Sequence, residues 1–202
     1  MTNSSTPPEP AGGDAIDFLI GQHDMIRDLL AEVSESAGPV RQLAFERLVR
    51  LLAVHETAEE QLVHPLAQVS VDGSDDLLAQ RLAEEREAKE TLAELERMGP
   101  DAPEFEALFE QFRGKVLAHV HLEEVDEFTA LRASVPAQQL RALVAMLKIA
   151  EAVAPTHPHP GVESAVANYV AGPVLSLFDR TTDFARKALV SQGSARVGGE
   201  ER

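Results

Sequence analysis

Two pairs of side chains in this sequence have the spacing of metal ligands on a helix. Each pair is a histidine followed four residues later by a glutamate: His55 and Glu59 in HETAE, and His119 and Glu123 in HVHLE. Residues four apart lie about 40° apart around an α-helix, so each pair offers a nitrogen and a carboxylate on one face. Imidazoles bind transition metals, and carboxylates can bridge two of them. The two pairs therefore predict a site for two metal ions.

Two single polar residues, His23 and Glu85, fall on the apolar faces of other predicted helices. A carboxylate that is ionised in a helical core is costly unless a partner compensates for it, and a cation is such a partner. Without metal, His23 would be a hydrogen-bonded core histidine and Glu85 would pair with Lys89 at the rim. The His–Glu pairs would then be ordinary surface pairs. The candidate metal ligands are His23, His55, Glu59, Glu85, His119 and Glu123, and no separate catalytic residue is predicted.

The elements that must position these residues are four long helices. Apolar residues recur every three to four positions over about residues 14–36, 39–69, 74–98 and 103–131, which is the pattern of amphipathic helices. Long helices joined by short turns favour an up-down-up-down four-helix bundle with a C-terminal helical extension. No stretch alternates apolar and polar residues for long, so the predicted fold class is all-α.

The two ends of the chain differ in composition from the bundle. We expect a disordered N-terminal arm at 1–13, the bundle at 14–135, a helical extension at 136–190 and a disordered tail at 191–202. Within the extension, helices are predicted at about 137–153 and 173–190. A proline-rich loop between them carries His157 and His159, which we expect to be solvated.

The composition excludes several classes of function. Acidic residues number 34 against 18 Lys and Arg, for a net charge of -16, which disfavours nucleic acid as a partner because like charges repel. The absence of cysteine removes thiolate nucleophiles and thiolate metal sites, and fits a reducing cytoplasm. The sequence has no run of about 18 apolar residues, so no membrane span is predicted. No phosphate-binding loop or nucleophile motif competes with the metal site.

These residues resemble the hemerythrin-like family, also called the HHE cation-binding domain, over about residues 14–131. Its pattern is a histidine on helix one, His–xxx–Glu on helix two, a histidine on helix three and His–xxx–Glu on helix four. The stretches QHDMIRDLL, HETAEEQLVHPL and HVHLEEVDEF are similar to its signatures on helices one, two and four. The segment PHPGVES and the predicted helix after it are similar to a C-terminal extension of actinobacterial members.

The resemblance implies a non-haem centre of two iron ions, bridged by an oxo or hydroxo group, that meets dioxygen, hydrogen peroxide or nitric oxide. Glu85 stands where family members usually have histidine, and a more anionic, oxygen-rich site favours ferric iron. Reversible oxygen carriage needs a stable diferrous state, so this departure favours catalase- or peroxidase-like turnover. The alternative is a non-enzymatic sensor or store for dioxygen, nitric oxide or iron. We expect a monomer or small homo-oligomer.

Several neighbours of the candidate ligands point elsewhere on regular helices. Three glutamates lie 100° or more from the first residue of each pair, which predicts solvated or supporting roles: Glu56, Glu60 and Glu124. His64 lies about 180° from His55, so we predict packing between helices for it. His121 is predicted to be exposed or packed on another helix.

Overall fold

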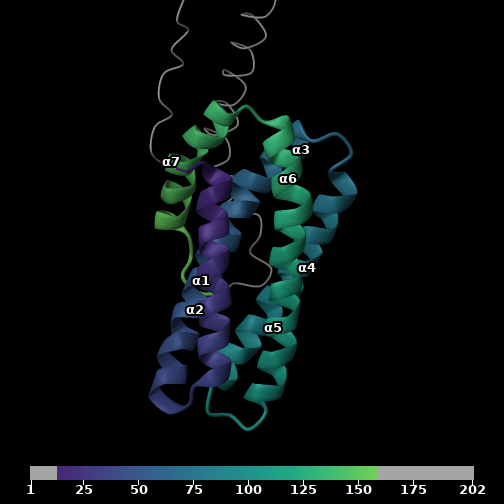
Figure 1. Ribbon diagram of the computed structural model, residues 1–202. Helices are drawn as coiled ribbons and strands as arrows, with labels where there is room; N and C mark the ends of the chain where they lie inside the picture. Colours follow the sequence, from purple (N-terminus) through teal and green to yellow (C-terminus); the bar gives the residue numbers. More distant parts are fainter. Residues whose placement is uncertain (1–12, 159–202) are drawn as a thin grey trace, which may run out of the picture. The chain divides into compact units, whose positions relative to one another are not determined.

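The computed structural model describes residues 13–158, and these residues are all-α (Figure 1). The helices are α1 (Ala15–Glu35), α2 (Gly38–Ala58), η1 (Glu59–Val63), α3 (His64–Ser70), α4 (Asp75–Met98), α5 (Phe105–Leu122), η2 (Glu123–Glu127), α6 (Phe128–Ser134) and α7 (Ala137–Val153). No β-strand occurs between residues 13 and 158, which confirms the predicted class. The predicted tail, the second helix of the extension, His159 and all of the predicted arm except Gly13 lie outside the described residues.

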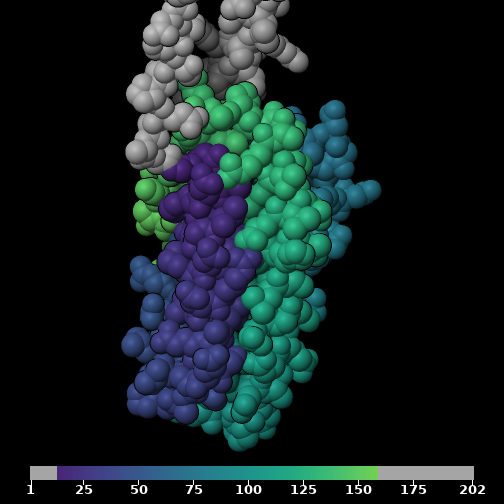
Figure 2. Space-filling view, viewed as in Figure 1, coloured from purple at the N-terminus to yellow at the C-terminus, as the bar shows by residue number. Residues whose placement is uncertain are grey.

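The long helices lie side by side as a helical bundle. The turns between α1 and α2 and between α4 and α5 lie at one end, and the α3–α4 turn lies at the other (Figure 1). Helix α1 contacts α2, α5 and α7, and α4 contacts α5 and α2. On the face seen in Figure 2, the side chains of α1 meet those of α5 and α6 along a continuous boundary. Helix α4 ends at Met98 because Gly99 takes a φ of 78°, which side chains disfavour.

Two predicted helices contain a wider turn that the sequence pattern did not indicate. The segments η1 and η2 are π-helical, with the His64 N–H donating to the Glu59 carbonyl and the Phe128 N–H to the Glu123 carbonyl. Each π turn begins at the glutamate of a His–xxx–Glu pair. Such a turn inserts one residue into the helix and rotates all later residues by about 100°. Faces extrapolated with α-helical periodicity are therefore wrong beyond these points.

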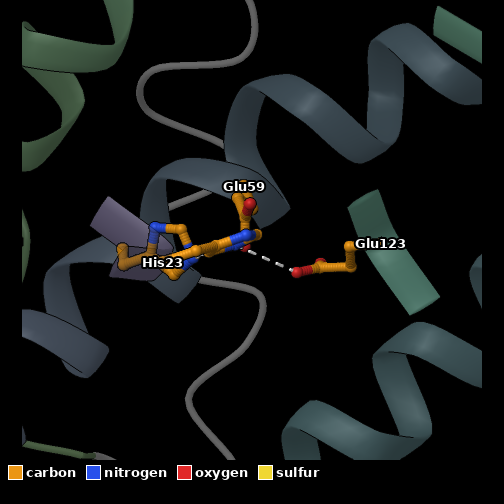
Figure 3. Close-up of side chains that lie close together, drawn as sticks. His23, Glu59 and Glu123 are labelled. Atoms are coloured by element: carbon orange, nitrogen blue, oxygen red, sulfur yellow. Dashed lines mark hydrogen bonds and ion pairs between the residues drawn. The ribbon is translucent and has the colours of Figure 1, made fainter. Parts of the chain in front are cut away.

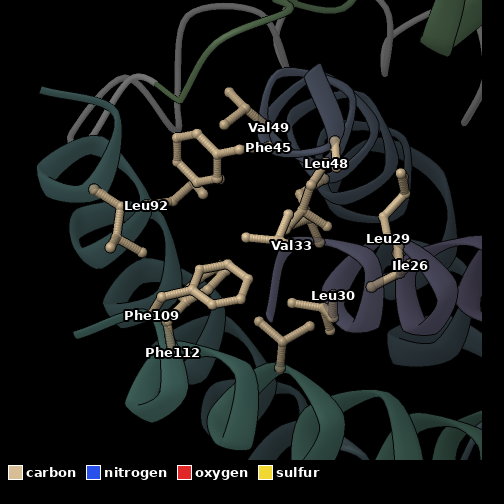
Figure 4. Close-up of a cluster of buried hydrophobic side chains, with 14 of the residues drawn as sticks. Ile26, Leu29, Leu30, Val33, Phe45, Leu48, Val49, Leu92, Phe109 and Phe112 are labelled. Carbon is tan, nitrogen blue, oxygen red and sulfur yellow. The ribbon is translucent and has the colours of Figure 1, made fainter. Parts of the chain in front are cut away.

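An apolar core joins α1, α2, α4 and α5 towards the end with the α1–α2 and α4–α5 turns (Figure 4). Ile26 and Leu30 of α1 are fully buried there. The Phe45 ring meets the Phe105 ring edge-on with centroids 5.1 Å apart, and Phe105 stacks on Phe109 at 5.4 Å. Burying such side chains is the main favourable term in folding, so this region holds the helices together.

Helix α7 packs against α1, α2 and η1. Its buried face is apolar and consists of Leu140, Leu143, Leu147 and Ala150. This helix matches the first predicted helix of the extension, and its contacts place it against the segments that carry the candidate ligands. Among residues 13–158, no helix is long and apolar enough to cross a membrane.

Candidate metal centre

Four of the predicted ligands lie together between α1, α2 and the two π turns. The His23 Nε2 atom lies 3.2 Å from Nε2 of His55 and 3.4 Å from Oε2 of Glu123. The Nε2 atom of His55 lies 3.3 Å from Oε2 of Glu59. Figure 3 shows the side chains of His23, Glu59 and Glu123 converging from their separate helices. One ligand atom from each of these four residues lies within 4.8 Å of the others.

A second group of ligand atoms adjoins the first. Glu56, Glu85 and His119 also bring one ligand atom each within 4.8 Å of one another. The two groups meet through Glu123, whose Oε1 lies 3.3 Å from Nε2 of His119. The structure therefore brings all six predicted residues into one buried region, as two adjoining groups. A third group shares Glu85 and Glu123 with them and adds His64.

The carboxylates in these groups lack the partners that buried polar atoms normally have. Both carboxylate oxygens of Glu59 and Glu123 are buried without a hydrogen-bond partner in the described part of the chain, and so is Oε2 of Glu85. Nε2 of His119 is in the same state. Burying a charge costs several kcal/mol unless it is paired, so this donor set fits a cation. Nitrogen and oxygen donors of this kind suit first-row transition metals.

Three histidines are oriented by a partner on the far side of each ring. Nδ1 of His23 lies 2.9 Å from Oε1 of Glu124, and Nδ1 of His119 lies 3.1 Å from Oε2 of Glu84. Nδ1 of His55 lies 2.9 Å from Oε1 of Gln22. A hydrogen bond donated from Nδ1 leaves the lone pair on Nε2, which is the nitrogen facing the centre in each case.

The part of the chain that carries the centre matches a known protein family. Residues 14–131 match the family described as the hemerythrin HHE cation binding domain. The chain belongs to this family. It is therefore a cation-binding domain, as the resemblance implied.

Two similar proteins place this HHE domain among relatives. A solved structure of a hemerythrin HHE cation binding domain-containing protein from Mycobacterium kansasii superposes with a TM-score of 0.61 at 24% identity, covering 70% of this chain and 89% of that one. This likeness shows the fold. A Nostoc sp. protein named DNA nickase is 30% identical over 125 residues, which is 61% of this chain. The HHE chain spans 35% of that protein's length.

Burial and like charges disfavour ionised carboxylates in the metal-free HHE domain. Burial, with Glu123 nearby, raises the pKa of Glu59 well above its usual value. Burial, with Glu85 nearby, raises the pKa of Glu56 to about 7. Burial and the neighbouring His23 lower the pKa of His55 to about 3. Without a cation these three side chains favour their neutral forms. Although burial opposes charge at Glu123 and His119 too, hydrogen bonds from His119 and His23 lower the pKa of Glu123, and the bond to Glu123 raises the pKa of His119 to about 10. A bound cation would favour ionised carboxylates and unprotonated histidines.

His64 is buried between helices, as predicted, and it also contacts the centre. Its Nε2 lies 2.6 Å from Oε1 of Glu85 and its Nδ1 lies 2.9 Å from Oε1 of Glu127. Although burial opposes charge on His64, the hydrogen bonds that its ring donates to these carboxylates raise its pKa well above the usual value. The π turn η1 places His64 one turn after Glu59 on the same face. Pro65, which lacks an N–H, is the one local signal of an irregular helix here.

The other neighbours divide into confirmed and corrected predictions. Glu56 is buried at the second group, so of its two predicted roles the solvated one is wrong. Glu60 pairs with Lys89. For Glu85, the alternative to a ligand role placed it at the rim with Lys89, and this placement is wrong because Glu85 is 1% exposed, although its Oε2 lies 3.9 Å from Nζ of Lys89. Two histidines, His121 and His157, are exposed as predicted.

Proposed function

We propose that this HHE domain holds two iron ions within an up-down-up-down four-helix bundle and consumes hydrogen peroxide. The proposed ligands are His23, His55, Glu59, Glu85, His119 and Glu123, joined by Glu56. The observation that carries the proposal is the set of buried carboxylate oxygens without partners beside histidine nitrogens. A purely structural bundle would have no reason to keep these groups, because apolar residues of similar size would stabilise it better.

The two adjoining groups favour a pair of ions over a single ion. The group of His23, His55, Glu59 and Glu123 would hold one ion, and the group of Glu56, Glu85 and His119 would hold the other. Glu123 is the residue between them, because one of its oxygens faces His23 and the other faces His119. Carboxylates bridge metal ions in this way in other helical bundles.

The donor set favours redox turnover over reversible oxygen carriage. Glu85 replaces a histidine, and Glu56 adds a further carboxylate, so oxygen donors outnumber nitrogen donors. Hard, anionic oxygen ligands stabilise ferric iron. When bound, the iron pair would supply the electron transfers by which two molecules of hydrogen peroxide become two of water and one of dioxygen.

The protein's own groups would hold protons and exclude water. His64 holds a proton on Nε2 that it donates to Oε1 of Glu85, and Glu127 accepts from Nδ1 of the same ring. His23 stacks on Phe128 with ring centroids 5.4 Å apart, which shields this side of the centre from solvent. Such a dry site strengthens every electrostatic interaction within it.

Metal analysis tests the dinuclear proposal. We expect two irons per chain, and ligand-to-iron charge-transfer absorption, in protein purified from iron-replete cells. Zero or one bound iron would overturn the dinuclear assignment.

The substitution Glu85→His separates turnover from sensing. If Glu85 binds iron and holds it ferric, the variant should keep both metals, raise the reduction potential of the pair and consume peroxide more slowly. The matched control is Glu90→His, the same change at an exposed position of α4. An unchanged potential, spectrum and rate in the Glu85 variant would reject its ligand role and favour the sensor or store.

A further inference from the structure

A chain of hydrogen bonds connects α7 to His55 at the candidate metal centre. The Gln22 amide lies between His55 and Glu151 and is 5% exposed. Its Nε2 donates to Oε1 of Glu151 at 2.8 Å, and its Oε1 lies 2.9 Å from Nδ1 of His55. Three segments are thereby connected: α1 supplies Gln22, α2 supplies His55 and α7 supplies Glu151.

The partner of His55 differs in kind from the partners of His23 and His119. Those two rings face Glu124 and Glu84, and a carboxylate only accepts hydrogen bonds. Each of these carboxylates therefore requires a proton on the Nδ1 that it faces, and no third residue is needed to select that tautomer. Arg27 and Arg81 in turn hold the two carboxylates at 2.8 and 2.7 Å.

An amide does not have this property. One end of Gln22 accepts a hydrogen bond and the other donates, and a rotation of 180° exchanges the ends. With its NH₂ towards the ring, Gln22 would require a lone pair on Nδ1 of His55 and a proton on Nε2. That proton would occupy the position through which His55 faces Glu59 and His23.

The acceptor that selects the orientation is Glu151. Its carboxylate requires the NH₂ of Gln22, which turns the amide oxygen towards His55. We infer that Glu151 is a positioning residue, acting through Gln22 to keep the lone pair of His55 on Nε2, where the ring binds metal. This inference rests on the proposed metal centre only in its last clause, because the position of the proton is a property of the metal-free protein.

Glu151 lies outside the residues that match the family, which end at 131. The first helix of the extension therefore does more than cover the bundle: it supplies the group that sets the proton on one ligand. Partners of metal-binding histidines typically change metal affinity about 10- to 100-fold when they are removed.

Charge reversal at Glu151 tests the inference. A lysine ammonium only donates, so in Glu151→Lys the Gln22 oxygen should turn to the new side chain and its NH₂ to His55. In metal-free protein at pH 8, ¹⁵N NMR should show the His55 proton move from Nδ1 to Nε2. The affinity for Fe(II), titrated without oxygen, should fall about 10- to 100-fold.

Three variants serve as controls. Glu151→Asp keeps a carboxylate, which only accepts, for Gln22, so tautomer and affinity should stay within about twofold of wild type. Ala152→Lys introduces a lysine at an exposed position one residue on and should change neither. The double variant Gln22→Glu with Glu151→Lys should restore both, because the new carboxylate accepts from the lysine and from Nδ1 of His55.

Several outcomes would overturn the inference. An Nδ1 proton retained in Glu151→Lys would do so, and so would a loss of affinity that the double variant does not rescue, since that marks a structural role of α7. If Glu151→Lys fails to fold, Glu151→Met removes the acceptor without adding charge and should give a mixture of the two tautomers. If no form binds iron but the proton moves as expected, the proposed function fails and the positioning role stands.

Discussion

The two regions of this bundle use the same helices for opposite purposes. Towards the α1–α2 and α4–α5 turns, the facing side chains are apolar (Figure 4), as in the contacts among Phe45, Phe105 and Phe109. Around the π turns, carboxylates and histidines face inward, with Glu59 and Glu123 fully buried. The first region stabilises itself by removing apolar surface from water. The second contains ion pairs between histidines and carboxylates, yet several of its buried carboxylate oxygens lack a hydrogen-bond partner in the described part of the chain, which favours a bound cation.

The backbone differs between the two regions in the same way. The apolar region consists of regular α-helix, whereas both π turns begin at candidate ligands, Glu59 and Glu123. A π turn is rare in helices and is frequent at functional sites. Here it brings His64 to Glu85 and so enlarges the set of polar groups at the centre. The helices thus depart from regular α-helical geometry at the positions where the candidate ligands converge.

The largest expected effect comes from the apolar region. Phe109→Ala should lower the free energy of unfolding by about 3–5 kcal/mol, since it removes a buried ring and leaves a cavity. Because this region does not depend on metal, the loss should be the same with and without a chelator in urea unfolding. The exposed Val40→Ala should change stability by less than about 0.5 kcal/mol. A loss for Phe109→Ala that depends on metal would contradict the independence of the two regions.

A substitution in the polar region should raise the stability of the metal-free protein, whereas Phe109→Ala lowers it. Glu59→Gln should cost at least one metal ion, yet at pH 8 it should stabilise the metal-free protein by on the order of 2 kcal/mol, because it removes a buried carboxyl that the folded state must either keep charged without a hydrogen bond or protonate. Metal content and thermal unfolding after chelation measure the two effects. Glu46→Gln, an exposed change on α2, should do neither. Retention of two ions would remove Glu59 from the ligand set, and a less stable metal-free variant would show that its carboxylate has an unseen partner.

The dependence of stability on pH sharpens the comparison. In the metal-free protein the pKa of Glu56 is raised to about 7, so the folded state binds a proton that the unfolded chain has lost above its usual 4.5. Stability should therefore fall as pH rises from about 4.5 to 7. Relative to Glu56→Gln, the wild type should lose on the order of 2 kcal/mol over this window.

Urea unfolding of both proteins at several pH values, with metal removed, measures this difference. A constant difference across the window would mean that Glu56 titrates normally. Phe109→Ala offers a matched comparison, because a change in the apolar region should lower stability equally at every pH in this range.

The smallest effect is expected from an exposed ion pair outside both regions. Arg132 of α6 contacts two aspartates at the start of α1. Its Nη1 lies 3.0 Å from Oδ2 of Asp14, and its Nη2 lies 2.6 Å from Oδ1 of Asp17. Hydrogen bonds from the Asp14 backbone and from Arg132 lower the pKa of Asp17, so this contribution is present above pH 3.8 and lost as pH falls below it. Arg132→Ala should cost less than about 1 kcal/mol in thermal unfolding at pH 7, and salt should reduce that cost. A larger loss would mean that the start of α1 is held chiefly by this pair.

Residue spacing alone was enough to predict the long helices and the central metal-binding residues. Apolar spacing gave the bounds of α1, α4 and α7 to within about two residues, because a helix that packs on one face must repeat its apolar residues at 3.6-residue intervals. The same register placed His55 and Glu59 on one inward face. It also placed Glu85 inward, although the sequence left open whether that carboxylate would pair with Lys89.

The other features of the centre depend on how the helices pack against one another. The π turn η1 brings His64 to the centre. The spacing of apolar residues did not show where the helix changes from α to π geometry. Glu56 is buried because α4 and α5 bring Glu85 and His119 to it, not because of its place on its own helix. Gln22 and Glu151 are 129 residues apart, and a single contact at that separation leaves no periodic trace in a sequence. Local spacing records which face of a helix is inward, whereas the groups that meet there depend on how the helices pack.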